Sequence, residues 1–222
     1  MSPLTLRRRA AGHRPRRDDR GRTRRRRITL AAGTAAALLA LPTAIATAAP
    51  DGTAPSTDGP RPLAAKRLDI SMQAQELSNW CWAAGGNTIS TYMGKNYSQN
   101  AFCNAAFGRS QGSSCPNSQA TLGHVQNALD WMGINPGSYV SGWLRYSTVQ
   151  SEINADRPVE TRILWSSGGG HMHVLYGYDT SRNWVYWGDP WPSNTRYNWA
   201  SHSWYIDNNE FSWTHSLYRI GA

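Results

Sequence analysis

The repeat of apolar residues along this chain changes from a helical period to a strand period at Pro158. Upstream, apolar side chains recur three or four residues apart and Gly closes several runs, as at the ends of amphipathic helices. Downstream, short apolar segments are separated by turn residues such as Gly168 and Asn183, which is typical of antiparallel strands. A helical half followed by an antiparallel half predicts an α+β fold.

These two periods also predict the individual elements. Helices are expected over 81–93, 98–107, 121–132 and 147–155. Strands are expected over 159–165, 171–178 and 184–188, with shorter strands around Trp199, over 204–206, around Trp213 and over 217–220.

The N-terminal 48 residues have the features of an export signal. Four arginines, 24–27, precede an uncharged run rich in Ala and Leu over 28–49, and Ala46-Thr47-Ala48 is a small-x-small cleavage site. We predict a signal peptide over 1–48 and a secreted mature chain. An uncleaved membrane anchor is the alternative, because 22 uncharged residues can just span a bilayer, although Pro42 and the small residues disfavour it. The arginines also resemble a twin-arginine signal faintly.

The net charge of +9 comes from this signal segment. Residues 1–48 hold 12 of the 23 Lys and Arg but 2 of the 14 Asp and Glu, so residues 49–222 carry 11 basic and 12 acidic residues, a net charge of −1. We therefore expect no nucleic-acid partner, and no stable membrane association once the signal is removed. Residues 49–66 are polar and rich in Pro, and are predicted to be a disordered linker or short pro-segment. Residues 67–222 then form one domain, expected to be a monomer.

Three cysteines in an exported chain leave one of them unpaired, because oxidising compartments close disulfides in pairs. Cys103 and Cys115 are 12 residues apart and flank a Gly- and Ser-rich loop that can turn back on itself, so we predict a disulfide between them. Cys81 is then the free thiol. A free Cys beside Trp and Ala is often an inert core residue. A catalytic role for Cys81 therefore requires a histidine placed to activate it.

Cys81 lies where a helix is expected to begin, because Ser78 and Asn79 are N-cap residue types and an apolar run from Trp82 follows them. A helix N-terminus favours the thiolate, the form of cysteine that attacks a carbonyl. The Cys81 backbone N–H would remain unpaired and available to a developing oxyanion. The amide of Gln75 is the second expected oxyanion donor.

This segment, Gln75 and five further residues before Cys81-Trp82-Ala83, resembles the nucleophile segment of papain-like cysteine peptidases. Those enzymes carry their catalytic histidine six residues before a Gly-Tyr pair at the end of an apolar strand, and His171 stands in that place before Gly177-Tyr178. The resemblance makes His171 the general base. His173 is its rival, because residues two apart on a strand share a face, and the two histidines could also form a metal-ligand pair.

Asp189 is the expected partner of this histidine. A base imidazole needs an acceptor on its other nitrogen, and Asp189 follows the next predicted strand, so that a hairpin would bring it beside His171. Asp189-Pro190-Trp191 resembles the Asn/Asp-x-Trp of papain-like enzymes, in which the indole shields the histidine hydrogen bond. Taken alone, Asp-Pro is more simply a turn. Asp189, in place of the more common Asn, makes the pattern resemble that of a bacterial secreted branch, the AvrRpt2-type and C39-like peptidases.

The resemblance covers roughly residues 68–192. It implies a papain-like fold, with the nucleophile at a helix N-terminus and a C-terminal antiparallel half-barrel. It further implies a secreted cysteine endopeptidase that cleaves proteins or peptides through Cys81, His171, Asp189 and Gln75, with no metal and no organic cofactor. The short pro-region and the lack of a second Cys near Cys81 depart from the plant-type pattern, so plant-type specificity is not carried over.

Other functions remain open from the sequence. Acyl transfer to amines, as in transglutaminases, and cleavage of cell-wall peptides would use the same triad, because the acceptor is chosen by the pocket. The 11 tryptophans of the chain also fit a carbohydrate-binding module, since indole faces stack on sugars, although core packing explains them more simply.

Overall fold

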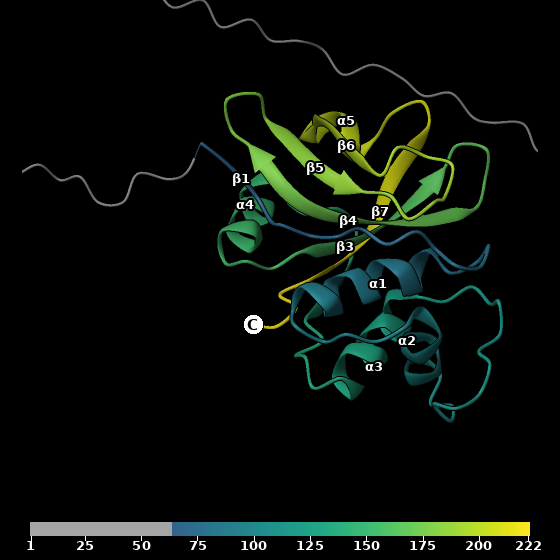
Figure 1. The fold of residues 1–222 in the computed structure, drawn as a ribbon. Helices are drawn as coiled ribbons and strands as arrows, with labels where there is room; N and C mark the ends of the chain where they lie inside the picture. Colours follow the sequence, from purple (N-terminus) through teal and green to yellow (C-terminus); the bar gives the residue numbers. More distant parts are fainter. Residues whose placement is uncertain (1–63) are drawn as a thin grey trace, which may run out of the picture. The chain divides into compact units, whose positions relative to one another are not determined.

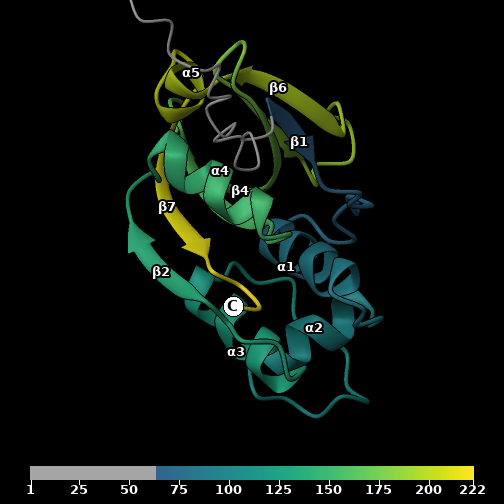
Figure 2. The same ribbon diagram turned by 90° about the vertical axis from the view of Figure 1, so that its left-hand side faces the viewer.

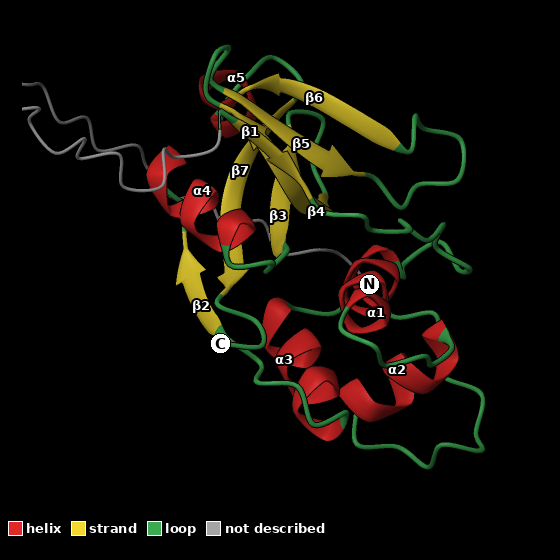
Figure 3. Ribbon diagram, turned by 60° about the vertical axis from the view of Figure 1, so that its left-hand side comes forward, coloured by secondary structure: helices red, strands yellow, loops and turns green. Residues whose placement is uncertain are grey.

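The computed structural model describes residues 64–222, so the predicted signal segment 1–48 and nearly all of the predicted linker lie outside the described residues. The described part consists of a helical layer packed against one face of an antiparallel sheet (Figures 1 and 3). This arrangement confirms the predicted α+β class with its helical half first. Within residues 64–222, the helices are too short or too polar to cross a membrane.

Four helices fall where the helical period predicted them. They are α1 (Cys81–Tyr92), α2 (Gln99–Ala106), α3 (Leu122–Trp131) and α4 (Tyr146–Asn154). Gly94 and Gly108 follow the ends of α1 and α2 with φ of 81° and 61°, a left-handed backbone that Gly adopts without strain, which explains why these helices end there.

The sheet has seven strands, β1 (Ala65–Arg67), β2 (Ser138–Ser141), β3 (Val159–Trp165), β4 (Gly170–Asp179), β5 (Trp184–Gly188), β6 (Tyr197–Ser201) and β7 (Phe211–Tyr218). Their order is β2-β7-β3-β4-β5-β6, and every pairing is antiparallel. β1 pairs with the end of β4, beyond the last residue that β3 reaches. Figure 2 shows β2 beside β7, at the edge of the sheet that begins this order.

Three predictions about the elements need correction. Residues 204–206, expected as a strand, lie in helix α5 (His202–Ile206), whose N-terminus is capped by the Ser201 side chain accepting from the Trp204 N–H. The run around Trp213 and the first two residues of the run predicted over 217–220 belong to one strand, β7, which ends at Tyr218. The short strands β1 and β2 were not predicted, and β1 includes Ala65 and Lys66, which had been assigned to the linker.

Small residues let α1 lie close to its neighbours on both sides. A Cβ atom on Gly85 would lie 2.8 Å from Glu160 Oε1 on β3, and one on Gly86 would lie 2.3 Å from the Phe102 ring on α2. Helix α1 therefore lies directly between the sheet and helices α2 and α3 (Figure 1). This packing fixes the height of Cys81, its first residue, above the sheet.

Helix α5 covers the opposite face of the sheet (Figure 1). Its Tyr205 hydroxyl lies 2.7 Å from Thr161 Oγ1 on β3, whereas Glu160, the residue before Thr161, faces α1. Side chains alternate between the two faces in this part of β3, so Arg162, two residues after Glu160, lies on the same face as Glu160.

Candidate active site

Cys81 and His171 line one cavity of about 550 Å³ between the start of α1 and the start of β4. We call it the Cys81 cavity. Its wall also includes Arg162 and Trp165 from β3, and Trp191 from the loop after β5. The helical layer and the sheet thus each supply one of the two reactive side chains.

Cys81 is the first residue of α1 and is a half-buried free thiol. The predicted disulfide between Cys103 and Cys115 is present. No hydrogen bond from the Cys81 backbone N–H is formed within residues 64–222, so this donor is available at the helix start. The expected N-caps are wrong: Trp80 is the N-cap, and no side chain caps the helix.

The loop around residues 115–118 holds the segment that carries the nucleophile. Trp80 Nε1 donates to the Pro116 carbonyl at 3.0 Å, and Trp82 Nε1 donates to the Ser118 carbonyl at 3.1 Å. The Asn79 N–H donates to Asn117 Oδ1 at 2.9 Å. Sequence reasoning missed this loop, because these contacts join residues 36 or 38 positions apart without any motif.

His171 is held from several sides beside Cys81. Its Nε2 lies 2.7 Å from Asp189 Oδ1, and its ring stacks on Trp165 with centroids 5.8 Å apart. Burial opposes the charged imidazole, but the hydrogen bonds to Asp189 and to Cys81 outweigh it and raise the pKa of His171 to about 9. Because Nε2 is engaged by Asp189, Nδ1 is the nitrogen left to exchange a proton with the thiol.

Asp189 is a buried carboxylate that accepts hydrogen bonds on both oxygens. Besides the bond to His171, Oδ1 accepts from the Trp191 N–H at 2.8 Å, and Oδ2 accepts from Asn194 Nδ2 at 2.9 Å. Burial raises its pKa, but the hydrogen bond to His171 and the nearby His173 ring, with Nε2 3.6 Å from Oδ2, prevail and lower it well below the usual range. The Trp191 ring meets His171 edge-on with centroids 6.2 Å apart, the place expected of the shielding indole.

His173, the rival base, lies behind the cavity and does not line it. It is 1% exposed, its Nδ1 lies 3.2 Å from the Tyr205 hydroxyl, and its ring stacks on Trp187. Burial lowers its pKa, which favours the neutral form. The structure therefore places His171, and not His173, in the cavity wall together with Cys81.

His171, His173 and Asp189 also bring one possible metal-donor atom each within 4.8 Å of one another. His171 Nε2 and Asp189 Oδ1 already form the 2.7 Å hydrogen bond between two of these residues. A metal at this point would have to break that bond, so the arrangement fits a proton relay better than a metal centre.

Gln75 is buried, and its side chain does not line the Cys81 cavity. Its Nε2 donates both hydrogens to backbone carbonyls, Leu77 O at 2.9 Å and Ser78 O at 2.9 Å. Its Oε1 is buried without a hydrogen-bond partner among the described residues. In this geometry Gln75 shapes the turn that leads to Cys81, and a role as oxyanion donor requires one of the two bonds to open.

Glu160 is a second buried acid close to the nucleophile. It is fully buried beneath Gly85, and both carboxyl oxygens lack a hydrogen-bond partner within the described part of the chain. Burial, followed by repulsion from Cys81, raises its pKa well above the usual range. A neutral carboxylic acid therefore lies under the helix that carries Cys81.

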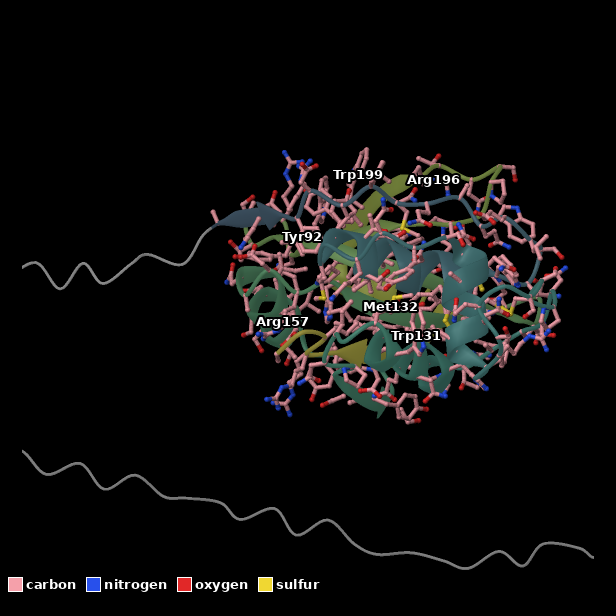
Figure 4. All side chains as sticks on the ribbon, turned by 60° about the horizontal axis from the view of Figure 1, so that its bottom comes forward. Tyr92, Trp131, Met132, Arg157, Arg196 and Trp199 are labelled. Carbon is pink, nitrogen blue, oxygen red and sulfur yellow. A yellow bond between two sulfur atoms is a disulfide. The ribbon has the colours of Figure 1, made fainter. Side chains whose placement is uncertain are left out.

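The two most exposed tryptophans lie on different elements, well apart from each other. Trp131 on α3 and Trp199 on β6 are 49% and 57% exposed, and Figure 4 shows them well apart. Several others, such as Trp80 and Trp82, are buried and donate to loop carbonyls. Core packing therefore accounts for much of the tryptophan content.

Comparison with known proteins was made on both sequence and structure. A sequence-family model described as Peptidase C70, papain-like cysteine protease AvrRpt2, matches residues 64–210. No curated protein shows significant sequence similarity to the chain. The peptidase domain of Streptococcus ComA, a bifunctional ABC transporter, superposes with a TM-score of 0.50 at 17% identity, covering 67% of this chain and 97% of that one.

Two further solved structures resemble the chain more distantly. A double-glycine-motif protease from an AMS/PCAT transporter gives a TM-score of 0.43 at 16% identity, covering 71% of this chain and 95% of that one. Xylellain, a cysteine protease from Xylella fastidiosa, gives 0.44 at 10% identity, covering 71% of this chain and 86% of that one. At these identities, the ComA superposition establishes a shared fold.

Proposed function

The chain belongs to the Peptidase C70 family of papain-like cysteine proteases, and we propose that it is a secreted endopeptidase that uses Cys81, His171 and Asp189 as its catalytic triad. A protease of this family acts on a protein or peptide. One observation carries the triad. Cys81 and His171 line the same cavity, and His171 Nε2 lies 2.7 Å from Asp189 Oδ1.

In the proposed first step, the Cys81 thiolate attacks the carbonyl carbon of the scissile peptide bond. The resting proton sits on His171, because its raised pKa of about 9 favours the imidazolium at neutral pH. The tetrahedral intermediate collapses as the C–N bond breaks. His171 Nδ1 gives its proton to the leaving amine, and a thioester remains on Cys81.

In the second step, water attacks the thioester carbon while His171 takes a proton from it. The carboxylic acid product leaves, and Cys81 regains its thiolate as His171 regains its imidazolium. Asp189 holds the imidazole in one tautomer through Nε2 and stabilises its charge in both steps.

The proposed oxyanion site begins with the Cys81 backbone N–H, which no described residue engages. Such preorganised donors stabilise the charge that develops on the carbonyl oxygen. Gln75 Nε2 is the proposed second donor. Both of its hydrogens are donated to backbone carbonyls in this structure, and we expect one of these two hydrogen bonds to open when substrate enters.

The proposal includes export through the signal peptide 1–48 and action as a monomer outside the cell, without a nucleic-acid partner. The disulfide between Cys103 and Cys115 supports export, because such bonds persist in oxidising compartments.

Alkylation of the thiol, followed by peptide mapping, tests the proposal. Cys81 is the one cysteine outside the disulfide, so iodoacetamide should label Cys81 and abolish hydrolysis of a generic protein substrate. Cys81→Ala should also lose activity, by about 10³-fold or more, while its circular dichroism stays unchanged. Full hydrolysis by Cys81→Ala would reject the triad, and incorporation of a labelled amine in place of hydrolysis would assign acyl transfer instead.

A further inference from the structure

Arg162 lies in the wall of the cavity that contains Cys81 and His171. It follows Glu160 by two residues on β3, so both side chains face the helical layer. Across the sheet it is paired with Met172 on β4, another residue of the cavity wall. The position brings a positive charge into the space that a substrate must occupy.

The guanidinium of Arg162 is fixed in place. Its Nη1 donates to Thr214 Oγ1 at 2.9 Å, and its planar group packs over Gly170, the residue before His171. A Cβ atom on Gly170 would lie 2.6 Å from Nη2 and 2.8 Å from Cζ, so the lack of a side chain makes room for the group. Arg162 is thus held over the residue that precedes the proposed base.

No carboxylate neutralises this charge. The ion pairs formed within residues 64–222 do not include Arg162, and Glu160 on the same strand face leaves both its oxygens unpaired. No Asp or Glu lines the Cys81 cavity. Apart from the bond to Thr214, the guanidinium hydrogens meet no acceptor among the described residues. A half-buried cation with unused donors is a binding group for an anion.

We propose that Arg162 binds a carboxylate of the substrate, so that the protease prefers an acidic side chain, Asp or Glu, at the substrate residue that lies against β3. This preference rests on the proposed function, because it assumes that the cavity receives a peptide. The guanidinium offers a planar pair of donors that matches a carboxylate, and its partial burial limits screening by salt.

The preference is tested with matched pairs of peptides. Within each pair, one position on either side of the scissile bond holds Glu in one peptide and its neutral isostere Gln in the other. At the position that faces Arg162, Glu should exceed Gln by about tenfold in kcat/KM. Arg162→Met should bring this ratio close to one, and Arg162→Glu should favour Lys over Gln at the same position. Arg162→Lys should retain part of the preference, because it keeps the charge and loses the planar fork.

Two controls separate this role from a general loss of structure. Arg182→Met removes an exposed arginine outside the cavity and should leave the ratio unchanged. Gly170→Ala keeps Arg162 but displaces its guanidinium, and should lower the ratio as Arg162→Met does. A ratio near one at every position in the wild type, or a ratio that survives Arg162→Met, would overturn the proposal.

Labelling of Cys81 by peptidyl chloromethyl ketones with Glu or Gln at that position gives a readout that needs no turnover. Faster labelling by the Glu reagent, lost in Arg162→Met, supports the acidic preference even if no peptide is hydrolysed. In that case the proposed hydrolysis fails and the preference stands. If the peptides are hydrolysed but neither measurement shows a preference for Glu, the proposed hydrolysis stands and the acidic preference fails.

Discussion

His171 Nε2 lies 2.7 Å from Asp189 Oδ1, and both side chains are buried. A buried carboxylate at this distance stabilises the imidazolium, which explains how the pKa of His171 is raised to about 9 in spite of burial. If the imidazolium and thiolate form the active pair, kcat/KM should fall as pH rises through about 9, since His171 then loses its proton.

Asp189→Asn removes the charge and keeps the shape. We expect the basic limb of the kcat/KM profile to move to lower pH, because the neutral amide no longer raises the pKa of His171. The measurement is a pH profile with a fluorogenic peptide, with Asp130→Asn as an exposed control. A basic limb that stays at the same pH in Asp189→Asn would contradict this role.

Substitution of the two strand histidines should separate them clearly. His171→Ala is expected to lose about 10³-fold or more in kcat, because the base is removed. His173→Gln should lose less than about tenfold, since His173 lies outside the cavity and acts at most on the orientation of Asp189. Steady-state kinetics with both variants decide the matter, and the opposite order of losses would make His173 the base.

Gln75→Ala should lower both stability and turnover. Loss of the two bonds to Leu77 and Ser78 is expected to cost about 1–3 kcal/mol of unfolding free energy. Loss of an oxyanion donor should reduce kcat by about 10²-fold or more. Denaturant unfolding and single-turnover kinetics measure the two effects separately. Reduced stability with unchanged kcat would leave Gln75 a purely structural role.

Glu160→Gln should remove a pH dependence from stability. Burial raises the pKa of Glu160 in the folded state. The contribution of this side chain to the free energy of unfolding is therefore fully present below the unfolded-state pKa of about 4.3 and is lost as pH rises through the folded-state pKa. The unfolding free energy of the parent, relative to Glu160→Gln, should therefore fall with rising pH by up to about 1.4 kcal/mol per unit.

Denaturant titrations across the pH range, made in a Cys81→Ala background, provide this comparison. This background removes Cys81, which after burial is the second cause of the raised Glu160 pKa. The comparison then measures the effect of burial. Two parallel stability curves would mean that Glu160 is not held neutral in the folded protein.

Removal of the disulfide should loosen the segment around Cys81. The bond closes a loop of 12 residues, and its loss in the Cys103→Ala, Cys115→Ala double variant should cost about 2–4 kcal/mol. The loop that it anchors accepts from Trp80 and Trp82, so we expect the indole fluorescence and the rate of Cys81 alkylation to change as well. Unchanged alkylation together with reduced stability would show that the bond acts on the fold alone.

Local patterns in the sequence predict the long elements, and they also predict that Cys81, His171 and Asp189 lie close together, as the structure has them. Helical spacing places α1 to within a residue at each end, and the Gly-Tyr ending fixes the position of His171 on β4. Helix α5 escaped prediction, because its five residues are dominated by aromatic side chains that also favour strands.

Other parts of the site depend on contacts that no local pattern encodes. Asn117 reaches Asn79 across 38 residues, and Arg162 meets Gly170 only because β3 and β4 pair in one register. The raised pKa of Glu160 follows from its burial and its closeness to Cys81, which its place in an alternating strand does not reveal.

Cys81 and His171 stand ninety residues apart in the chain and belong to different layers of the molecule. A chain emerging from the ribosome exposes its thiol well before the imidazole exists to activate it. Activity that requires both residues can therefore appear only once the sheet has docked on the helical layer. The appearance of activity can then be used as a clock for that docking event in refolding experiments.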